Sequence, residues 1–248
     1  MKNYTSYDLI EWGKPFEKSQ HALPEPTLSE VLIRVTAAGL CHSDLHVQKG
    51  YMDLGEEGRL TFAERGAQLP MTFGHEIAGI VEAIGDKVKN VSIGQQVIVF
   101  PWIGCGDCLA CNEDRESDCS AMRIIGLKQK GGFATHCLIE NEKFLVNIDG
   151  LDAAEVVPHA CSGITVYNAL EKIGFLRDGE WLAVMGCGGL GLNAIAIAGA
   201  MGFENVIGID IDNSKLDAAR EMGASITLNS KSANAVAELQ KYAESRLM

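Results

Sequence analysis

Residues 181–191, WLAVMGCGGLG, indicate the fold of residues 161–248. A short apolar run over 181–185 is followed by a G-x-G-x-x-G pattern and by a helix-forming segment over 192–201. A strand, a glycine turn and a helix in this order let the backbone approach a pyrophosphate at the helix N-terminus, where partial positive charge lies. The residues expected at this turn are Gly186, Gly188, Gly189, Leu190 and Gly191.

The next segment strengthens this interpretation. An apolar strand expected over 205–210 ends at Asp210, where an acidic side chain can accept hydrogen bonds from the adenosine ribose and repel a 2′-phosphate. NAD is therefore expected rather than NADP. A third strand is expected over 223–228 and a helix over 233–245. A complete fold of this kind has about six strands, so residues 161–248 are expected to encode a partial, three-stranded domain with an exposed sheet edge.

Composition limits the classes of partner. The 248 residues carry a formal net charge of −12, which argues against a nucleic-acid or anionic membrane surface. The chain contains no apolar run of the ~20 residues that a membrane helix needs, and its first residues are too polar for a secretory signal. A cytoplasmic protein with a small-molecule partner is expected.

The first part of the chain, residues 1–160, has a β pattern. Runs rich in β-branched residues over 30–36, 77–84 and 96–100 are bounded by glycines, and no convincing helix is expected before residue 160 except a short one near 43–47. Several short strands separated by glycines predict a β-rich barrel. The charged residues 51–69 are expected to form an exposed excursion.

Four cysteines lie close together in a glycine-rich lobe over residues 104–120: Cys105, Cys108, Cys111 and Cys119. Zinc prefers four soft ligands, and C-x2-C spacing presents two thiolates with little backbone strain. The eight cysteines of a chain without an export signal also favour metal ligands over disulfides. Unliganded or disulfide-paired cysteines are the alternative. A closed four-sulfur site indicates a structural zinc ion.

A second set of candidates is scattered along the sequence: Cys41, His75 with Glu76, and Cys161. No spacing rule joins them. A lone cysteine after a strand is more often a packing residue than a ligand, and a lone histidine is usually satisfied by its neighbours. Of the remaining cysteines, Cys137 is expected to be a core residue and Cys187 a small residue of the glycine turn, and neither is given a role.

The motifs Gly39-x-Cys41-x-Ser43-Asp44, Gly74-His75-Glu76, the four-cysteine lobe, Cys161-Ser162-Gly163 and the glycine turn occur in the order found in medium-chain zinc-dependent alcohol dehydrogenases. The chain resembles this family from about residue 30 to residue 239. The resemblance implies an α/β protein with an N-terminal GroES-like β-barrel catalytic domain and a partial Rossmann domain. It also implies two Zn²⁺ ions per chain and NAD as cofactors.

The resemblance further implies residue roles. Cys41, His75 and Cys161 are expected to bind a catalytic zinc ion that keeps one position open, with Glu76 as an outer or transient ligand and Asp44 orienting His75. Ser43 and His46 are the expected proton relay. The expected cofactor contacts are His42 at the pyrophosphate, Thr165 at the nicotinamide, and Asp210 with Lys215 at the ribose.

The implied reaction is reversible hydride transfer between a primary or secondary alcohol and NAD. A related dehydrogenase acting on a polyol, amino alcohol or thiol adduct is an alternative, as is a zinc-binding fragment without catalysis. The resemblance implies a homo-oligomer for the full-length enzyme.

Overall fold

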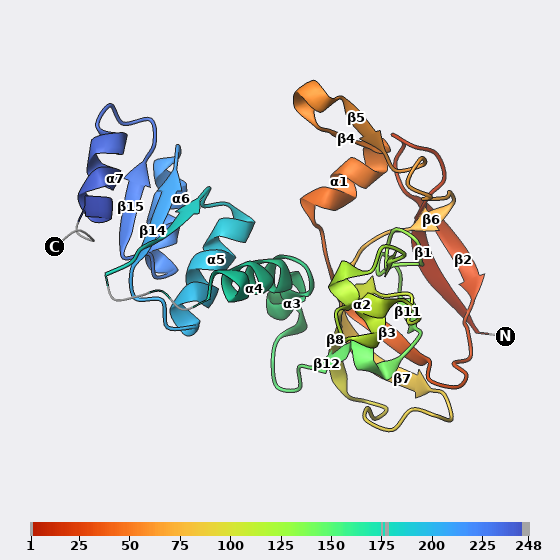
Figure 1. Cartoon of the computed structure of the whole chain (residues 1–248). Helices are drawn as coiled ribbons and strands as arrows, with labels where there is room; N and C mark the ends of the chain where they lie inside the picture. Colours follow the sequence, from red (N-terminus) through yellow and green to blue (C-terminus); the bar gives the residue numbers. More distant parts are fainter. Residues whose placement is uncertain (1, 175, 177–178, 245–248) are drawn as a thin grey trace. The chain divides into compact units, whose positions relative to one another are not determined.

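The computed structural model describes residues 2–174, 176 and 179–244 (Figure 1). The chain divides into two compact units, Met1–Cys161 and Ser162–Met248. The first unit is mainly antiparallel β-structure, and the second alternates strands with helices. Among the described residues, no helix is both long and apolar enough to cross a membrane.

A five-stranded antiparallel sheet forms the centre of the first unit. Its order is β11 (His136–Ile139), β3 (Val31–Gly39), β7 (Glu76–Ile84), β8 (Gln96–Val99) and β12 (Leu145–Asn147). β-Branched side chains suit this pleated surface, and those that are fully buried in its core include Val31, Ile33, Ile77, Val81, Val97, Val99 and Ile139. The strands that the sequence predicts near 30–36, 77–84 and 96–100 lie at the middle of this sheet.

A second antiparallel sheet was not predicted. It consists of β2 (Glu17–Ala22), β1 (Asn3–Leu9) and β6 (Met71–Thr72). The backbone N–H of Tyr7 donates to the carbonyl of Phe133 at 2.8 Å, and a bridge between Ser6 and Ala134 lies beside it. These contacts place the second sheet next to the edge strand β11 of the first.

Short elements carry the candidate site residues of the first unit. Helix α1 (His42–Lys49) follows β3, and the excursion after it contains the hairpin of β4 (Tyr51–Asp53) and β5 (Arg59–Thr61) with η1 (Gly55–Glu57) between them. The four-cysteine lobe contains α2 (Leu109–Asn112) and η2 (Glu116–Asp118), and the paired strands β9 (Trp102–Ile103) and β10 (Arg123–Ile124) flank it. Beyond η3 (Glu142–Phe144), α3 (Ala153–Val156) and η4 (Val157–Ala160) lead to Cys161.

The second unit begins with α4 (Ser162–Ile173) and contains a parallel sheet in the order β13 (Leu182–Met185), β14 (Val206–Asp210) and β15 (Ile226–Asn229). The connecting helices are α5 (Gly189–Ala200) and α6 (Asn213–Glu221), and α7 (Ala235–Glu244) follows β15 (Figure 1). The predicted three strands are present, although the third begins later than expected. The predicted last helix extends to residue 245, which lies outside the described residues.

Candidate metal centres and nucleotide-binding turn

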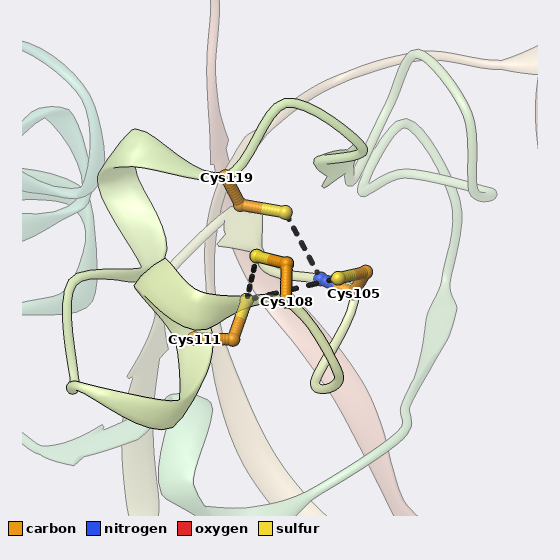
Figure 2. Close-up of side chains that lie close together, drawn as sticks. All are labelled: Cys105, Cys108, Cys111 and Cys119. Carbon is orange, nitrogen blue, oxygen red and sulfur yellow. Dashed lines mark hydrogen bonds between the residues drawn. The ribbon is translucent and has the colours of Figure 1, made fainter.

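The four sulfur atoms of the cysteine lobe lie within 4.8 Å of one another. Cys111 Sγ is 3.9 Å from Cys105 Sγ and 3.5 Å from Cys108 Sγ, and Figure 2 shows the four sulfur atoms facing a common centre. Sulfur atoms in a tetrahedron about 2.3 Å from one zinc ion lie about 3.8 Å apart. The separations are far longer than the S–S bond of about 2.05 Å. The donor set and its spacing therefore fit zinc, and the lobe contains no disulfide.

The thiols of this lobe differ in acidity. Backbone N–H groups of Asp107 and Cys108 lower the pKa of Cys105 to about 6. The backbone N–H of Gly106 lowers the pKa of Cys111, but burial and the neighbouring thiols outweigh it and raise that pKa to about 11. Crowded thiols cannot all ionise without a cation among them, so the arrangement favours a divalent metal ion.

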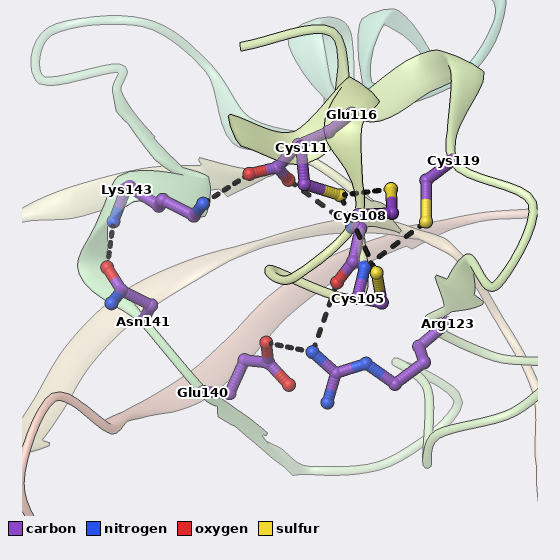
Figure 3. A network of polar contacts seen from close by, with 10 residues as sticks. Cys105, Cys108, Cys111, Glu116, Cys119, Arg123, Glu140, Asn141 and Lys143 are labelled. Atoms are coloured by element: carbon purple, nitrogen blue, oxygen red, sulfur yellow. Dashed lines mark hydrogen bonds and ion pairs between the residues drawn. The ribbon is translucent and has the colours of Figure 1, made fainter. Parts of the chain in front are cut away.

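Two ion pairs hold the lobe against the central sheet (Figure 3). The backbone N–H of Gly104 donates to Glu116 Oε2 at 3.3 Å, and Arg123 Nη2 donates to the carbonyl of Gly104 at 3.1 Å. Arg123 also binds Glu140 at 2.8 Å, at the end of β11, and Glu116 is paired with Lys143 of η3. A Cβ at position 104 would lie 2.6 Å from Cys111 Sγ. The peptide that precedes Cys105 is therefore fixed on both sides.

The second centre gathers residues that are far apart in the sequence. Ligand atoms of Cys41, His75, Glu76 and Cys161 lie within 4.8 Å of one another, and the two sulfur atoms are 3.9 Å apart. Cys41 caps the N-terminus of α1, Glu76 begins β7, and Cys161 follows η4. The start of α1, the start of β7 and the end of η4 therefore lie close together in the first unit. Two thiols, an imidazole and a carboxylate are a donor set that suits zinc.

Asp44 orients two of the candidate ligands. Its buried carboxylate has Oδ1 3.3 Å from Nδ1 of His75, and its Oδ2 accepts the backbone N–H of Cys41 at 2.9 Å. Burial lowers the pKa of His75, but the hydrogen bonds to Asp44 and Cys161 outweigh it and raise that pKa to about 11. With Nδ1 engaged by Asp44, Nε2 is the nitrogen that remains for a metal ion.

The Glu76 carboxylate lies where the side chain of any residue other than glycine at position 39 would be. The Glu76 side chain is buried, and burial raises the pKa of its carboxyl group. A Cβ on Gly39 would lie 1.9 Å from Glu76 Oε2. Glycine at position 39 therefore makes room for this carboxylate beside Cys41.

The predicted relay residues lie on α1 with different neighbours. Burial raises the pKa of Cys41, but backbone and side-chain hydrogen bonds from Ser43 outweigh it and lower that pKa. The rings of His42 and His46 lie edge to face with their centroids 4.8 Å apart. The structure thus brings Ser43 to the cysteine ligand and His46 to His42.

The glycine turn of the second unit has the geometry of a phosphate-binding turn. Gly186 has a positive φ of 92°, and its N–H donates to the carbonyl of Ile209 at 2.7 Å. A Cβ on Gly191 would lie 1.8 Å from the carbonyl oxygen of Gly186, so only glycine fits where α5 begins. The turn leaves open space at Gly188 and Gly189, since no heavy atom lies within 4 Å of a Cβ built there.

Asp210 lies at the C-terminal end of β14. It accepts the backbone N–H of Cys187 at 2.8 Å, that of Ile211 at 2.7 Å and that of Asp212 at 3.0 Å. These bonds, with the charge of Lys215, lower the pKa of Asp210. Asp210 is therefore a carboxylate fixed beside the glycine turn, and its contact with a ribose stays a prediction. Thr165 lies on α4 of the same unit.

Glu116, Arg123 and Lys143 are site residues that the sequence analysis missed. Their contacts join segments that no motif connects. Glu116 is one of four acidic residues between Cys111 and Cys119, and it binds the backbone of the lobe. Spacing alone does not distinguish it from the exposed acids around it.

Two family models match the chain. The alcohol dehydrogenase GroES-like domain matches residues 27–150, and the zinc-binding dehydrogenase model matches residues 189–247. The chain is 38% identical over 240 residues to an NAD-dependent alcohol dehydrogenase of Sulfurisphaera tokodaii, covering 96% of this chain and 67% of the relative. It is 37% identical over 239 residues to an NAD-dependent alcohol dehydrogenase of Saccharolobus solfataricus, with the same coverage.

Solved structures give the same result. The alcohol dehydrogenase of Aeropyrum pernix superposes with a TM-score of 0.81 at 27% identity, covering 96% of this chain and 68% of that chain. The D-arabinose dehydrogenase of Sulfolobus solfataricus superposes with a TM-score of 0.80 at 28% identity, covering 97% and 71%. The chain spans about two thirds of the length of the curated relatives named above.

Proposed function

The chain belongs to the zinc-binding alcohol dehydrogenases, a family of oxidoreductases, and on that premise we propose that it acts in the NAD-dependent oxidation of alcohols to aldehydes or ketones. The observation that carries the proposal is the cluster of Cys41, His75, Glu76 and Cys161, whose ligand atoms lie within 4.8 Å of one another. Thiolates and an imidazole are zinc ligands, and three such ligands leave a position open for substrate.

In this proposal Cys41, His75 and Cys161 hold the catalytic zinc ion. When bound, zinc supplies Lewis-acid stabilisation of negative charge on a substrate oxygen. Asp44 keeps the His75 ring in place through Nδ1 of the ring, and the buried Glu76 carboxylate would supply the fourth donor atom, an oxygen, when substrate is absent. The four-cysteine lobe would hold a second zinc ion whose role is structural.

Residues of α1 would move the substrate proton. Ser43 hydrogen bonds to Cys41, so its hydroxyl lies beside the proposed zinc ligand and would accept the proton of the substrate hydroxyl. His46 is half-buried on the next turn of α1 and would pass that proton toward solvent. His42, exposed at the start of α1, would bind the cofactor pyrophosphate.

The second unit would bind NAD, which supplies the hydride acceptor when bound. Backbone N–H groups of the glycine turn would donate to the pyrophosphate at the N-terminus of α5. The ribose hydroxyls would donate to the Asp210 carboxylate, beside which Lys215 lies. Thr165 would contact the nicotinamide. Because Asp210 is anionic, a 2′-phosphate would be repelled, which supports NAD over NADP.

Domain limits and cellular context are part of the same proposal. The catalytic domain would cover residues 1–160, with the structural zinc lobe over 104–120, and the dinucleotide-binding domain residues 161–248. None of the eight cysteines forms a disulfide, which supports a reducing, cytoplasmic location. A homo-oligomer is proposed for the full-length enzyme, and light scattering of the purified protein would measure its mass.

A sugar or polyol substrate is a second candidate. One observation favours it: the D-arabinose dehydrogenase covers 97% of this chain at 28% identity. Turnover of arabinose or sorbitol without turnover of ethanol, hexanol or cyclohexanol would favour this candidate over simple alcohols.

Elemental analysis combined with an NADH assay tests the leading proposal. The purified chain should contain two zinc ions and reduce NAD with an alcohol as donor. Cys41→Ser should remove one zinc ion and the activity, whereas Cys137→Ser, at a buried thiol outside both centres, should keep both ions. A zinc content unchanged by Cys41→Ser would contradict the proposed catalytic centre.

Cofactor binding is tested separately by NADH fluorescence. Gly191→Ala should abolish binding, because its Cβ would overlap the Gly186 carbonyl oxygen. Gly199→Ala, in the same helix with open space at its Cβ, should bind NADH as the unmodified chain does. Equal binding by both variants would contradict the placement of the pyrophosphate.

A further inference from the structure

A cavity of about 340 Å³ lies in the first unit, between the second sheet and the edge of the central sheet. Tyr4 of β1, His21 of β2 and His136 of β11 line it, together with Lys130 from the preceding loop. Its lining includes no residue of either candidate metal centre. Pockets of this size accommodate small organic molecules.

Lys130 supplies the positive charge of this cavity. Its Nζ lies 3.4 Å from the Tyr4 hydroxyl and 3.4 Å from His21 Nδ1, and 5.9 Å from the centre of the Tyr4 ring. In the part of the chain that the structure describes, no carboxylate is paired with this ammonium group. In a protein with a net charge of −12, an ammonium group whose partners are uncharged is available to an anion.

The two histidines are held in fixed orientations by groups outside the cavity. His21 Nε2 donates to the buried carboxylate of Asp8 at 3.1 Å, which leaves Nδ1 as the acceptor that faces Lys130. His136 Nε2 lies 3.3 Å from Glu82, and its Nδ1 lies 3.0 Å from the Thr135 hydroxyl. Neither Asp8 nor Glu82 lines the cavity. Their nearby negative charge disfavours a ligand that carries more than one negative charge.

Aromatic rings and aliphatic side chains form much of the cavity lining. The Tyr4 ring lies 5.3 Å from the His21 ring and 6.3 Å from the His136 ring, centroid to centroid. Leu32 and Leu138 add aliphatic surface. Rings at these separations can contact a planar ligand through its face or edge.

We propose that this cavity binds a small planar monocarboxylate, such as an aromatic acid. Lys130 Nζ and the Tyr4 hydroxyl, 3.4 Å apart, would each donate to one carboxylate oxygen, and the rings of Tyr4, His21 and His136 would contact the apolar body. Two donors suit a carboxylate better than a phosphate, which has more acceptor oxygens and carries more charge.

Benzoate is the probe, with the isosteric neutral benzamide as its control. Binding is measured by ¹H–¹⁵N NMR titration of the full, zinc-loaded chain. Benzoate should shift amide signals of β2 and β11 with a dissociation constant on the order of 1 mM. Benzamide and inorganic phosphate should bind at least about tenfold more weakly, because neither combines a single negative charge with a planar body.

Two matched lysine variants complete the test. Lys130→Met should weaken benzoate binding at least about tenfold, whereas Lys128→Met, an exposed lysine of the same loop that does not line the cavity, should leave it unchanged. Equal affinity of Lys130→Met and the unmodified chain would overturn the proposal. So would shifts confined to residues around Cys41 and His75, or benzamide binding as tightly as benzoate.

Discussion

Gly39 illustrates how a missing side chain makes room for a carboxylate of the proposed catalytic centre. Its Cα faces the buried Glu76 carboxylate, and no L-residue with a Cβ fits there without displacing Glu76 Oε2. Glu76 in turn lies among Cys41, His75 and Cys161. Gly39, which has no side chain, therefore determines the position of the Glu76 carboxylate in the proposed catalytic centre.

Gly39→Ala should displace the Glu76 carboxylate and lower both activity and stability. Overpacking of this kind costs about 1–3 kcal/mol of unfolding free energy. Denaturant unfolding and zinc-loaded kcat values measure the two effects. Gly199→Ala, in the last turn of α5 with open space around it, should instead stabilise the protein by about 0.4–1 kcal/mol. A Gly39→Ala variant as active and stable as the unmodified chain would contradict this account of Glu76.

Asp8 gives the fold a dependence on pH. Burial raises the pKa of Asp8, but hydrogen bonds from Thr72, Ser19 and His21 outweigh it and lower that pKa below its ordinary value. A carboxyl group whose pKa is lower in the folded state stabilises the protein above the unfolded pKa, and this stabilisation is lost as the pH falls through the folded pKa.

Asp8→Asn should therefore destabilise the protein by about 1–2 kcal/mol at pH 7 and reduce its loss of stability on acidification below about pH 4. Urea unfolding at several pH values measures both. Asp86→Asn, at an exposed position, serves as the control and should change neither quantity. An identical pH dependence of Asp8→Asn and the unmodified chain would exclude this role for Asp8.

Among the helices and strands, those with a clear local pattern of apolar residues could be predicted from the sequence. Strands β3, β7 and β8 could be predicted because their runs of β-branched residues form the buried core of the central sheet. Strand β1 was missed because its buried positions include the polar Ser6 and Asp8, which hide the alternation of apolar residues. Strand β2 was missed because none of its residues is buried. Elements stabilised by polar contacts leave little hydrophobic signal in the sequence.

The cysteine lobe depends on its outer ion pairs. Its helices α2 and η2 are too short to be stable alone. Glu116→Gln should weaken the contact with Lys143 and speed zinc release on the order of tenfold. A chromogenic chelator measures the rate. Glu113→Gln, which alters an exposed ion pair with Arg115 in the same lobe, should release zinc at the unmodified rate. Equal rates for all three proteins would show that the ion pairs do not retain the metal.

At the scale of the whole molecule, the two units differ in what stabilises them. Each unit has an apolar core, which in the second includes Ile195, Ala198, Val206 and Leu216, but both candidate metal centres lie in the first. The cysteine lobe could be predicted from spacing alone. The second centre could not, because Cys41, His75 and Cys161 are joined by folding, and only the resemblance to a known family suggested their association.

Chelation should therefore act on one unit. Removal of zinc should abolish hydrogen-exchange protection around Cys105–Cys119 and lower it in α1, while β13, β14 and β15 keep their protection. Hydrogen exchange followed by mass spectrometry resolves these segments. Readdition of zinc is the control and should restore protection. Loss of protection in the second unit at the same rate would contradict independent stabilisation.

The bond between Asp8 and Thr72 also affects the order of folding. These residues are 64 positions apart, and the Thr72 hydroxyl donates to Asp8 at 2.6 Å. β1 and β2 can pair early because they form a local hairpin, whereas β6 joins only after a long loop has closed at an entropic cost. The second sheet should therefore assemble in two steps, with its third strand added late.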